Sequence, residues 1–451
     1  MKNTTNLTTQ NIPTLIKQLA IPASTGMFFN TMYNVVDTFY AGLISTQAIA
    51  ALSLSFMIFF LIIGFGYGFS SAITALLGNS FGKKRYKLAS IYAHKGLIFV
   101  PLIGIILSAI GYFISPYLFT LLGASGEYLD TAIEYINPIL FGAVFFMFNF
   151  SLNAILVSLG DTKTYRNTLI FGFFANLVLN PLFIYGFLFI PAMGIKGIAI
   201  ATVLIQVINM FYMLYKVLQT KVIHFEKLEY FLPNIRIYKQ FMVQGLPASL
   251  NMLTMAIGSL ILTYFVAHYG MHAVAGYGIG FRVEQLMLLP ALGLSTAVLT
   301  LVSNNYGAKK YDRVIEILKT ALKYGFIIST VGIITLTLLG EFIISQFDSN
   351  EVVVAFGLDY LLVEIWIFYA YVVLFICVST LQGIKKPKMI LYIGLYRQIV
   401  AKLIVAFIIV KYFELDFIYL WFGILFMIYS AAIFAYFYTN KLLKENCHRT
   451  I

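Results

Sequence analysis

A single carboxylate lies in the first long apolar segment of the chain. Asp37 stands between Val35-Val36 and Thr38-Phe39-Tyr40, and no other acidic residue precedes Glu127. A charged side chain at the centre of a membrane helix costs about 2.5–3.5 kcal/mol on insertion scales, and such residues commonly mark ion or proton pathways. We therefore interpret Asp37 as the residue that binds a proton or a cation.

Polar side chains in two later apolar segments have the spacing and the chemistry to join Asp37. Asn176 and Asn180 are four positions apart, so they share one face of a helix, and Thr202 lies in the next segment. Amide, hydroxyl and carboxylate oxygens suit a proton or a hard cation such as sodium. Pro181 frees a backbone carbonyl that an ion or water can use, and we treat it as a hinge. The alternative is that these amides and hydroxyls only join helices by hydrogen bonds.

Further polar residues of the same half are candidates for lining a substrate cavity. Helical spacing places some of them on the face of Asp37, and the others lie in the fourth and sixth apolar segments. Packing between helices is the open alternative for the fourth-segment pair. The cavity candidates are Asn30, Tyr33, Asn34, Asn149, Asn153 and Gln206.

A second group of ionisable residues lies within apolar segments of the other half. We interpret this group as a buried structural network, and the open alternative is a second proton or cation site. Arg282 and Glu284 are two positions apart, so on a helix they point about 200° apart and cannot pair directly. The members are Arg282, Glu284, Glu364, Arg397 and Lys402.

The composition is that of an integral membrane protein. The chain has 451 residues, of which 61% are hydrophobic and 11% are charged. Soluble domains have about 45–50% apolar and about 25% charged residues. The net charge of +12 would fit nucleic-acid binding, but its distribution between loops excludes that interpretation, as shown next.

The apolar runs predict an all-α polytopic membrane protein with about twelve transmembrane helices, because crossing the hydrocarbon takes about 20 residues. Lysine and arginine gather in alternate loops, at Lys84, Lys163, Lys221, Lys309 and Lys385, whereas the opposite loops carry mainly acids. By the positive-inside rule both termini are cytoplasmic. The predicted spans are 14–41, 48–77, 88–114, 130–157, 166–187, 193–217, 238–267, 272–303, 314–340, 352–382, 389–411 and 416–440.

Short motifs recur at one constant displacement along the chain. IPAS at Ile21–Ser24 recurs as LPAS at Leu246–Ser249, and NSFG at Asn79–Gly82 recurs as NNYG at Asn304–Gly307. We therefore predict two pseudo-symmetric six-helix lobes around a central cavity, with residues 1–219 and 237–451 as lobes and 220–236 as a cytoplasmic linker. At the same displacement Asp37 projects onto Leu262, so the two lobes carry different polar residues.

Taken together, these segments resemble the multidrug and toxic compound extrusion (MATE) transporters over almost the whole chain. The chain is more similar to the branch with an aspartate in the N-terminal lobe, since Asn251 stands where another branch has a glutamate. Relatives of this branch commonly have an aspartate where this chain has Asn180. The resemblance rests on Pro22, Asp37, NSFGKKRY at Asn79–Tyr86, LGDTK at Leu159–Lys163, Asn176 to Pro181, GLPAS at Gly245–Ser249, FRVEQ at Phe281–Gln285 and NNYGAKKYDR at Asn304–Arg313.

The resemblance implies a secondary multidrug efflux antiporter that exports amphipathic, often cationic compounds in exchange for protons or sodium ions. It implies coupling at Asp37, Asn176, Asn180 and Thr202, with Tyr33 nearby. Our own hypothesis adds that neutralising Asp37 lets the first span bend near Pro22. A lipid-linked saccharide flippase of related architecture is the alternative. We expect a monomer in the cell (inner) membrane whose partners are small organic substrates and the lipid bilayer. We expect no nucleic acid, enzymatic activity, cofactor or structural metal.

Overall fold

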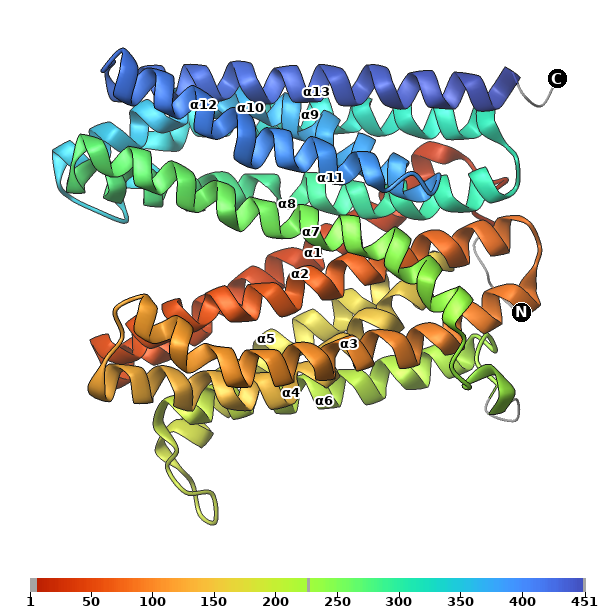
Figure 1. Cartoon of the computed structure of the whole chain (residues 1–451), viewed down its shortest axis with the longest axis horizontal. Coiled ribbons are helices and arrows are strands. Elements are labelled where there is room, and N and C mark those ends of the chain that lie inside the picture. Colours follow the sequence, from red (N-terminus) through yellow and green to blue (C-terminus); the bar gives the residue numbers. More distant parts are fainter. Residues whose placement is uncertain (1–5, 225–227, 449–451) are drawn as a thin grey trace. The chain divides into compact units, whose positions relative to one another are not determined.

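A computed structural model describes residues 6–224 and 228–448 of the chain, and the regular structure in these residues is helical. Figure 1 labels the long helices along the chain. The helices are α1 Ile12–Ile44, α2 Thr46–Gly82, α3 Tyr86–Leu121, α4 Gly126–Ser158, α5 Lys163–Tyr185, α6 Gly194–Gln219, η1 Leu228–Tyr230, α7 Ile235–Val266, η2 Ala267–Tyr269, α8 Met271–Gly307, α9 Tyr311–Ser345, α10 Glu351–Gly383, α11 Lys388–Leu395, η3 Tyr396–Val400, α12 Ala401–Phe407, η4 Ile408–Tyr412 and α13 Phe417–His448.

Within the described residues, eleven helical segments are long and apolar enough to cross a membrane. The first helix, α1, has 33 residues and is continuous through Pro22, but it falls outside those eleven. Its second half carries Asn30, Asn34 and Asp37, which lower its mean hydropathy. The all-α polytopic fold predicted from the sequence is therefore confirmed.

The eleventh predicted span is a helix interrupted by two π-helical turns. It runs from Lys388 to Tyr412, with π-helix at Tyr396–Val400 and again at Ile408–Tyr412. A π-helical turn inserts an extra residue into the helical repeat and often lies at a functional site. The first of these turns contains Arg397 and the buried Gln398.

The helix boundaries repeat with the displacement found in the sequence. Thr46–Gly82 recurs as Met271–Gly307, and Gly126–Ser158 recurs as Glu351–Gly383, with the same displacement at both ends of each helix. The turns after α2 and α8 match as well. Lys84 and Lys309 both adopt a left-handed conformation, with φ of 57° and 59°. The internal repeat is thus a repeat of structure.

The chain forms two compact units. One contains Thr25–Ser249, and the other contains Asn6–Ser24 together with the chain from Leu250 onward. Both α1 and α7 are therefore divided between the units, after Ser24 and after Ser249. These units differ from the lobes expected at residues 1–219 and 237–451, because the first part of each of these two helices packs with the other half of the chain.

The first parts of α1 and α7, which pack with the other half of the chain, each make one close helix crossing, one in each unit. In the second unit a Cβ at Gly293 of α8 would come 2.6 Å from the backbone nitrogen of Ser24, and the Ser24 hydroxyl donates to the Pro290 carbonyl at 3.4 Å. In the first unit Gly68 of α2 lies as closely against Ser249. The Ser249 hydroxyl donates to the Phe65 carbonyl, also at 3.4 Å. The internal repeat relates the two glycines to each other, and likewise the two serines.

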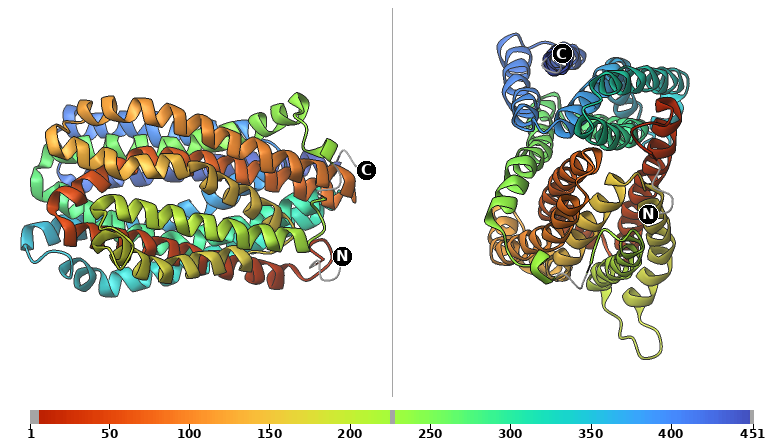
Figure 2. Two further views of the ribbon diagram at one scale, coloured as in Figure 1. Left: turned by 90° about the horizontal axis from the view of Figure 1, so that it is seen from below. Right: turned by 90° about the vertical axis from the view of Figure 1, so that its right-hand side faces the viewer.

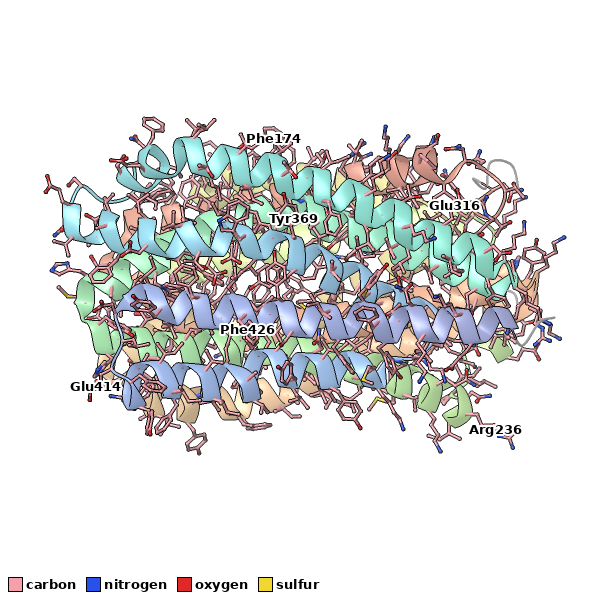
Figure 3. All side chains as sticks on the ribbon, turned by 90° about the horizontal axis from the view of Figure 1, so that it is seen from above. Phe174, Arg236, Glu316, Tyr369, Glu414 and Phe426 are labelled. Atoms are coloured by element: carbon pink, nitrogen blue, oxygen red, sulfur yellow. The ribbon has the colours of Figure 1, made fainter. Side chains whose placement is uncertain are left out.

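Each unit has its own hydrophobic core. In the second unit Trp421 of α13 is fully buried and packs edge-on against Tyr360 of α10, with the ring centroids 4.5 Å apart. Figure 3 shows how polarity varies along this unit: Tyr369 and Phe426 lie along the middle of their helices, whereas Glu316 and Glu414 lie towards opposite ends. This distribution is that of helices surrounded by hydrocarbon between two aqueous phases.

Candidate functional site

The first unit holds Asp37 where the second half of α1 packs against α5 and α6. Gly26 allows α1 to approach α5, since a Cβ there would lie 3.2 Å from the Arg166 Cα. Gly197 allows the same between α6 and α5, since its Cβ would lie 2.6 Å from the Phe183 carbonyl. In this packing Asp37 is only 5% exposed. Its carboxylate must therefore find its partners inside the protein.

Three side chains from α5 and α6 surround the carboxylate. Asn176 and Asn180 each donate an amide N–H to Asp37 Oδ1, at 2.8 Å and 2.9 Å. The Thr202 hydroxyl faces the other oxygen, Oδ2, at 3.5 Å. The structure thus brings together Asp37, Asn176, Asn180 and Thr202, the four residues that the sequence and the resemblance assign to coupling.

The arrangement leaves hydrogen-bonding capacity unused. The Oδ1 atoms of Asn176 and Asn180 are buried and have no hydrogen-bond partner among the residues that the structure describes. A buried carbonyl oxygen without a partner costs free energy, and such atoms in proteins commonly mark a bound ion, a water or a functional role. Two unused amide oxygens and a weakly bonded carboxylate oxygen therefore lie within one small polar site.

Tyr33 extends this network along α1. Its hydroxyl donates to Thr202 Oγ1 at 3.0 Å, and its backbone carbonyl lies 3.3 Å from the Asn176 amide nitrogen. Tyr33 lies one helical turn before Asp37, so both side chains reach α6 from the same face of α1. Any change in the bond between Thr202 and Asp37 therefore also affects Tyr33.

The carbonyl freed by Pro181 has a hydrogen-bond partner on α1 that the sequence did not predict. Proline at position 181 removes the helical bond to the Leu177 carbonyl, and the Tyr40 hydroxyl donates to that oxygen at 3.0 Å. One hydrogen bond to this carbonyl is therefore made by α1 itself. Helical spacing, three positions after Asp37, was the signal that could have identified Tyr40.

Two of the predicted cavity residues on α1 lie apart from the Asp37 network. Asn30 and Asn34 are exposed, and the Asn34 amide donates to the Asn30 carbonyl at 2.9 Å, within the same helix. We expected Asn30, Tyr33 and Asn34 to share the helical face of Asp37, but only Tyr33 joins its hydrogen-bond network. Hydrogen bonds link Asp37 through Thr202 to Tyr33, whereas the Asn34 side chain bonds to Asn30 within α1.

Of the predicted pair on α4, Asn149 is bonded to α6 elsewhere in the first unit. Asn149 is buried and donates to the backbone carbonyl and to the side-chain oxygen of Gln206, both at 2.9 Å. The Oδ1 atoms of Asn149 and Asn153 are buried without a hydrogen-bond partner within the described ranges 6–224 and 228–448. Gln206 lies one turn beyond Thr202, so the polar face of α6 continues past Thr202.

The second unit brings together four of the five ionisable residues of the predicted cluster. Glu284 of α8, Glu364 of α10, Arg397 and Lys402 are all buried, and they lie within electrostatic range of one another. Arg282 is exposed and does not belong to this cluster. The reason is helical geometry: a residue two positions from Glu284 lies on nearly the opposite side of α8.

Neutral groups complete the cluster. The Tyr360 hydroxyl donates to Glu284 Oε2, and Lys402 Nζ donates to Gln398 Oε1 at 2.9 Å. The Arg397 guanidinium lies over the Tyr371 ring at 5.6 Å from its centroid. Two acids and two bases in one buried region compensate each other's charge, which fits the structural network predicted from the sequence.

Repeated six-helix halves, membrane-spanning helices throughout and a buried polar constellation around one carboxylate define a multi-pass membrane transporter. The family model described as MatE matches residues 22–182 and 247–408. The chain belongs to this family, the MATE transporters.

Individual relatives are similar along most of their length. A probable multidrug resistance protein of Bacillus subtilis, YoeA, is 27% identical over 383 residues, which are 84% of this chain and 83% of that protein. A protein of Shewanella oneidensis named an FAD transporter is 26% identical over 90% of each chain. The structure of a multidrug resistance MATE transporter in an outward-facing conformation matches with a TM-score of 0.91 and 25% identity, over 99% of both chains.

Proposed function

We propose that the protein is a secondary active antiporter that exports amphipathic, often cationic compounds in exchange for protons or sodium ions. One observation carries the proposal: Asp37 is buried, and two amides donate to the same one of its oxygens. The other oxygen has only the long contact to Thr202. A buried carboxylate that has only one long hydrogen bond to one of its oxygens can bind a proton or a cation at that oxygen.

A proton would act through Asp37 Oδ2. Once protonated, this oxygen becomes a donor, and Thr202 Oγ1, at 3.5 Å, must accept instead of donate. The Tyr33 hydroxyl already donates to the same Thr202 oxygen, so proton binding changes the bonding between α1 and α6. Loss of the charge also removes the electrostatic cost of a less hydrated environment for Asp37.

A sodium ion would use the same residues in another orientation. It needs oxygen ligands, and the side-chain amides of Asn176 and Asn180 present nitrogen to Asp37 and leave their oxygens unused. A half-turn of either amide exchanges the two atoms with little change of shape. Asp37, Asn176, Asn180 and Thr202 together offer a sodium ion one carboxylate, two carbonyl oxygens and a hydroxyl.

Transport requires that the ion and the substrate favour different conformations of the protein. The coupling free energy is the difference between their affinities for those states, and a ligand without such a preference drives nothing. We assign Asp37 to this role because α1 passes from one compact unit to the other after Ser24. An ion bound to the second half of this helix thereby acts on an element shared by both units.

The distribution of basic residues supports a cell-membrane orientation with both termini in the cytoplasm. It also bears on the alternative function. A flippase for a lipid-linked saccharide needs a strongly cationic site for the diphosphate, whereas Arg397 and Lys402 are accompanied by Glu284 and Glu364. The antiporter is therefore the function that we propose.

Purified protein in liposomes tests this function directly. An imposed proton or sodium gradient should drive concentrative uptake of cationic dyes, and collapsing the gradient with an ionophore should abolish it. The panel should also contain an anionic flavin nucleotide, because one relative is named an FAD transporter. Gradient-independent movement of a lipid-linked saccharide, without any dye transport, would contradict the proposal.

A further inference from the structure

The connection between α5 and α6 is a hairpin that projects from the first unit. Residues 186–193 leave the end of α5 and extend sideways, across the direction of the helices, before the chain returns to α6 (Figures 1 and 2). We define these residues as the α5–α6 hairpin. At its tip Phe187 and Ile190 exchange two backbone hydrogen bonds, of 3.0 Å and 2.9 Å, so Leu188 and Phe189 form a closed two-residue turn.

The residues of this turn are unlike those of a turn in water. Two-residue hairpin turns favour asparagine, aspartate and glycine, which tolerate positive φ and hydrogen-bond with solvent. Here Leu188 adopts a φ of 50°, a conformation that is uncommon for a branched apolar residue. Leu188 is 82% exposed and Phe189 is 99% exposed. Neither the backbone conformation nor the hydration of the tip explains these side chains.

The hairpin is apolar along its whole length. From Gly186 to Ile195 the sequence GFLFIPAMGI contains no charged side chain, and Phe187 is 62% exposed as well. The first charge beyond it is Lys196, which is exposed at the start of α6. The predicted outer loops contain only one other basic residue, Lys411. An apolar tip followed by a single cation matches the order of layers at a membrane surface, with acyl chains next to phosphates.

We propose that the α5–α6 hairpin is a membrane-interface anchor whose partner is the lipid of the outer leaflet. Its sideways direction is parallel to the plane of a membrane crossed by α5 and α6 (Figure 2). Phe187, Leu188 and Phe189 insert at the boundary between acyl chains and headgroups, and Lys196 contacts lipid phosphates. Apolar, lipid-facing surface continues from the hairpin onto α5, where Tyr185 and Val178 are exposed.

The base of the hairpin is firmly joined to the coupling helices. The Met193 amide donates to the Phe183 carbonyl at 3.0 Å, and Gly197 packs against the same Phe183 backbone. Asn180 lies shortly before this base on α5, and Thr202 shortly after it on α6. The anchor therefore fixes the depth at which the outer ends of both Asp37-binding helices lie in the bilayer.

A spin label at Phe189→Cys in a Cys447→Ser background tests the anchor, and the remaining Cys377 is buried. Phe189 is 99% exposed, so its replacement removes no intramolecular packing. In nanodiscs with phosphatidylglycerol and phosphatidylethanolamine, we expect the label to be relaxed by lipid-soluble oxygen and protected from an aqueous nickel chelate. Ser349→Cys, exposed in another outer loop, is the control and should show the opposite preference.

Two results would overturn the anchor. One is equal access of the nickel chelate to the labels at positions 189 and 349. The other is protection of the 189 label from both reagents that disappears when each nanodisc holds a single protein, because that behaviour indicates contact with a second copy of the chain. Phe189→Asp with a label at Leu188→Cys provides an independent check, since a charged tip should move the label into water. These measurements require no transport and are independent of the antiport proposal.

Discussion

At the scale of single residues, Asn180 sets the number of carboxylates in the proposed coupling site. It donates to the same Asp37 oxygen as Asn176, and the resemblance places an aspartate at this position in related chains. The site of this chain therefore contains one carboxylate, with neutral side chains for the remaining ligands. A neutral set binds a metal cation less strongly than a set with two negative charges, because less Coulomb energy offsets ion dehydration.

Asn180→Asp should make the protein respond to sodium. The second carboxylate lies within hydrogen-bond distance of Asp37, and the repulsion between two buried carboxylates is relieved by a cation. We expect a rise in Tm with sodium concentration that is absent in the parent and in a matched Asn149→Asp variant. Thermal unfolding in detergent with sodium or choline chloride measures it. A folded Asn180→Asp protein that is indifferent to sodium would exclude this position from the ion site.

For the buried charges of the second unit, we predict a loss of stability when one charge is removed. If Glu284, Glu364, Arg397 and Lys402 form a structural network, then Lys402→Met leaves an uncompensated acid and destabilises by about 3 kcal/mol, as breaking buried ion pairs commonly does. Combining it with Glu284→Gln should recover part of that loss, so the double variant is more stable than additivity predicts. Thermal unfolding of the four proteins provides the cycle. Loss of transport in Glu284→Gln at unchanged Tm would instead indicate a second coupling site.

The sequence predicted which polar residues of the first unit meet better than it predicted their hydrogen bonds. Asp37, Asn176, Asn180 and Thr202 were found because polar groups are rare in apolar helices and their spacing is visible. Tyr40 was missed because a tyrosine near a helix end is common in membrane proteins. Its role depends on Pro181, which lies four helices later in the chain. Arg282 was wrongly included because burial depends on which face of α8 is packed, and composition does not report that face.

At the scale of helices, the internal sequence repeat corresponds to two equivalent helix crossings, in each of which a glycine packs against a serine. Gly68 and Gly293 occupy equivalent positions, and each meets a serine two positions after a proline, at Pro247 and Pro22. Each serine hydroxyl bonds a carbonyl of the opposing helix. The sequence showed IPAS and LPAS as a repeat, but not that each packs with the other half of the chain. That exchange is long-range packing, which motif spacing does not encode.

Gly293→Ala tests this crossing. The added Cβ would approach the Ala20 carbonyl to 2.7 Å and overlap Ser24, so the backbones must separate, at a cost of about 1–3 kcal/mol as for other overpacked sites. Gly278→Ala in the same helix has nothing within 4 Å of its Cβ and should be neutral or slightly stabilising. Thermal unfolding of both variants distinguishes them. Equal Tm values would show that the crossing is not tightly packed in the membrane protein.

At the scale of the whole molecule, the fold was the most predictable property. Hydropathy specified an all-α membrane protein, and the internal repeat specified two equivalent halves, because both depend on composition and order along the chain. The boundaries of α2 and α8, and of α4 and α10, reproduce that displacement at both ends. The division into compact units was not predictable in the same way, since it depends on where α1 and α7 pass from one unit to the other.

The central proposal is that a proton or sodium ion on Asp37 drives export. Asp37→Asn removes the ionisable group and keeps its size and one acceptor oxygen, and Asp37→Glu retains the charge. In liposomes with an imposed proton or sodium gradient, we expect the parent to accumulate a cationic dye and Asp37→Asn to lose gradient-driven uptake. Dye binding to the purified variant should persist, which separates lost coupling from lost folding. Gradient-driven transport by Asp37→Asn at the parent's rate would contradict the assignment of coupling to Asp37.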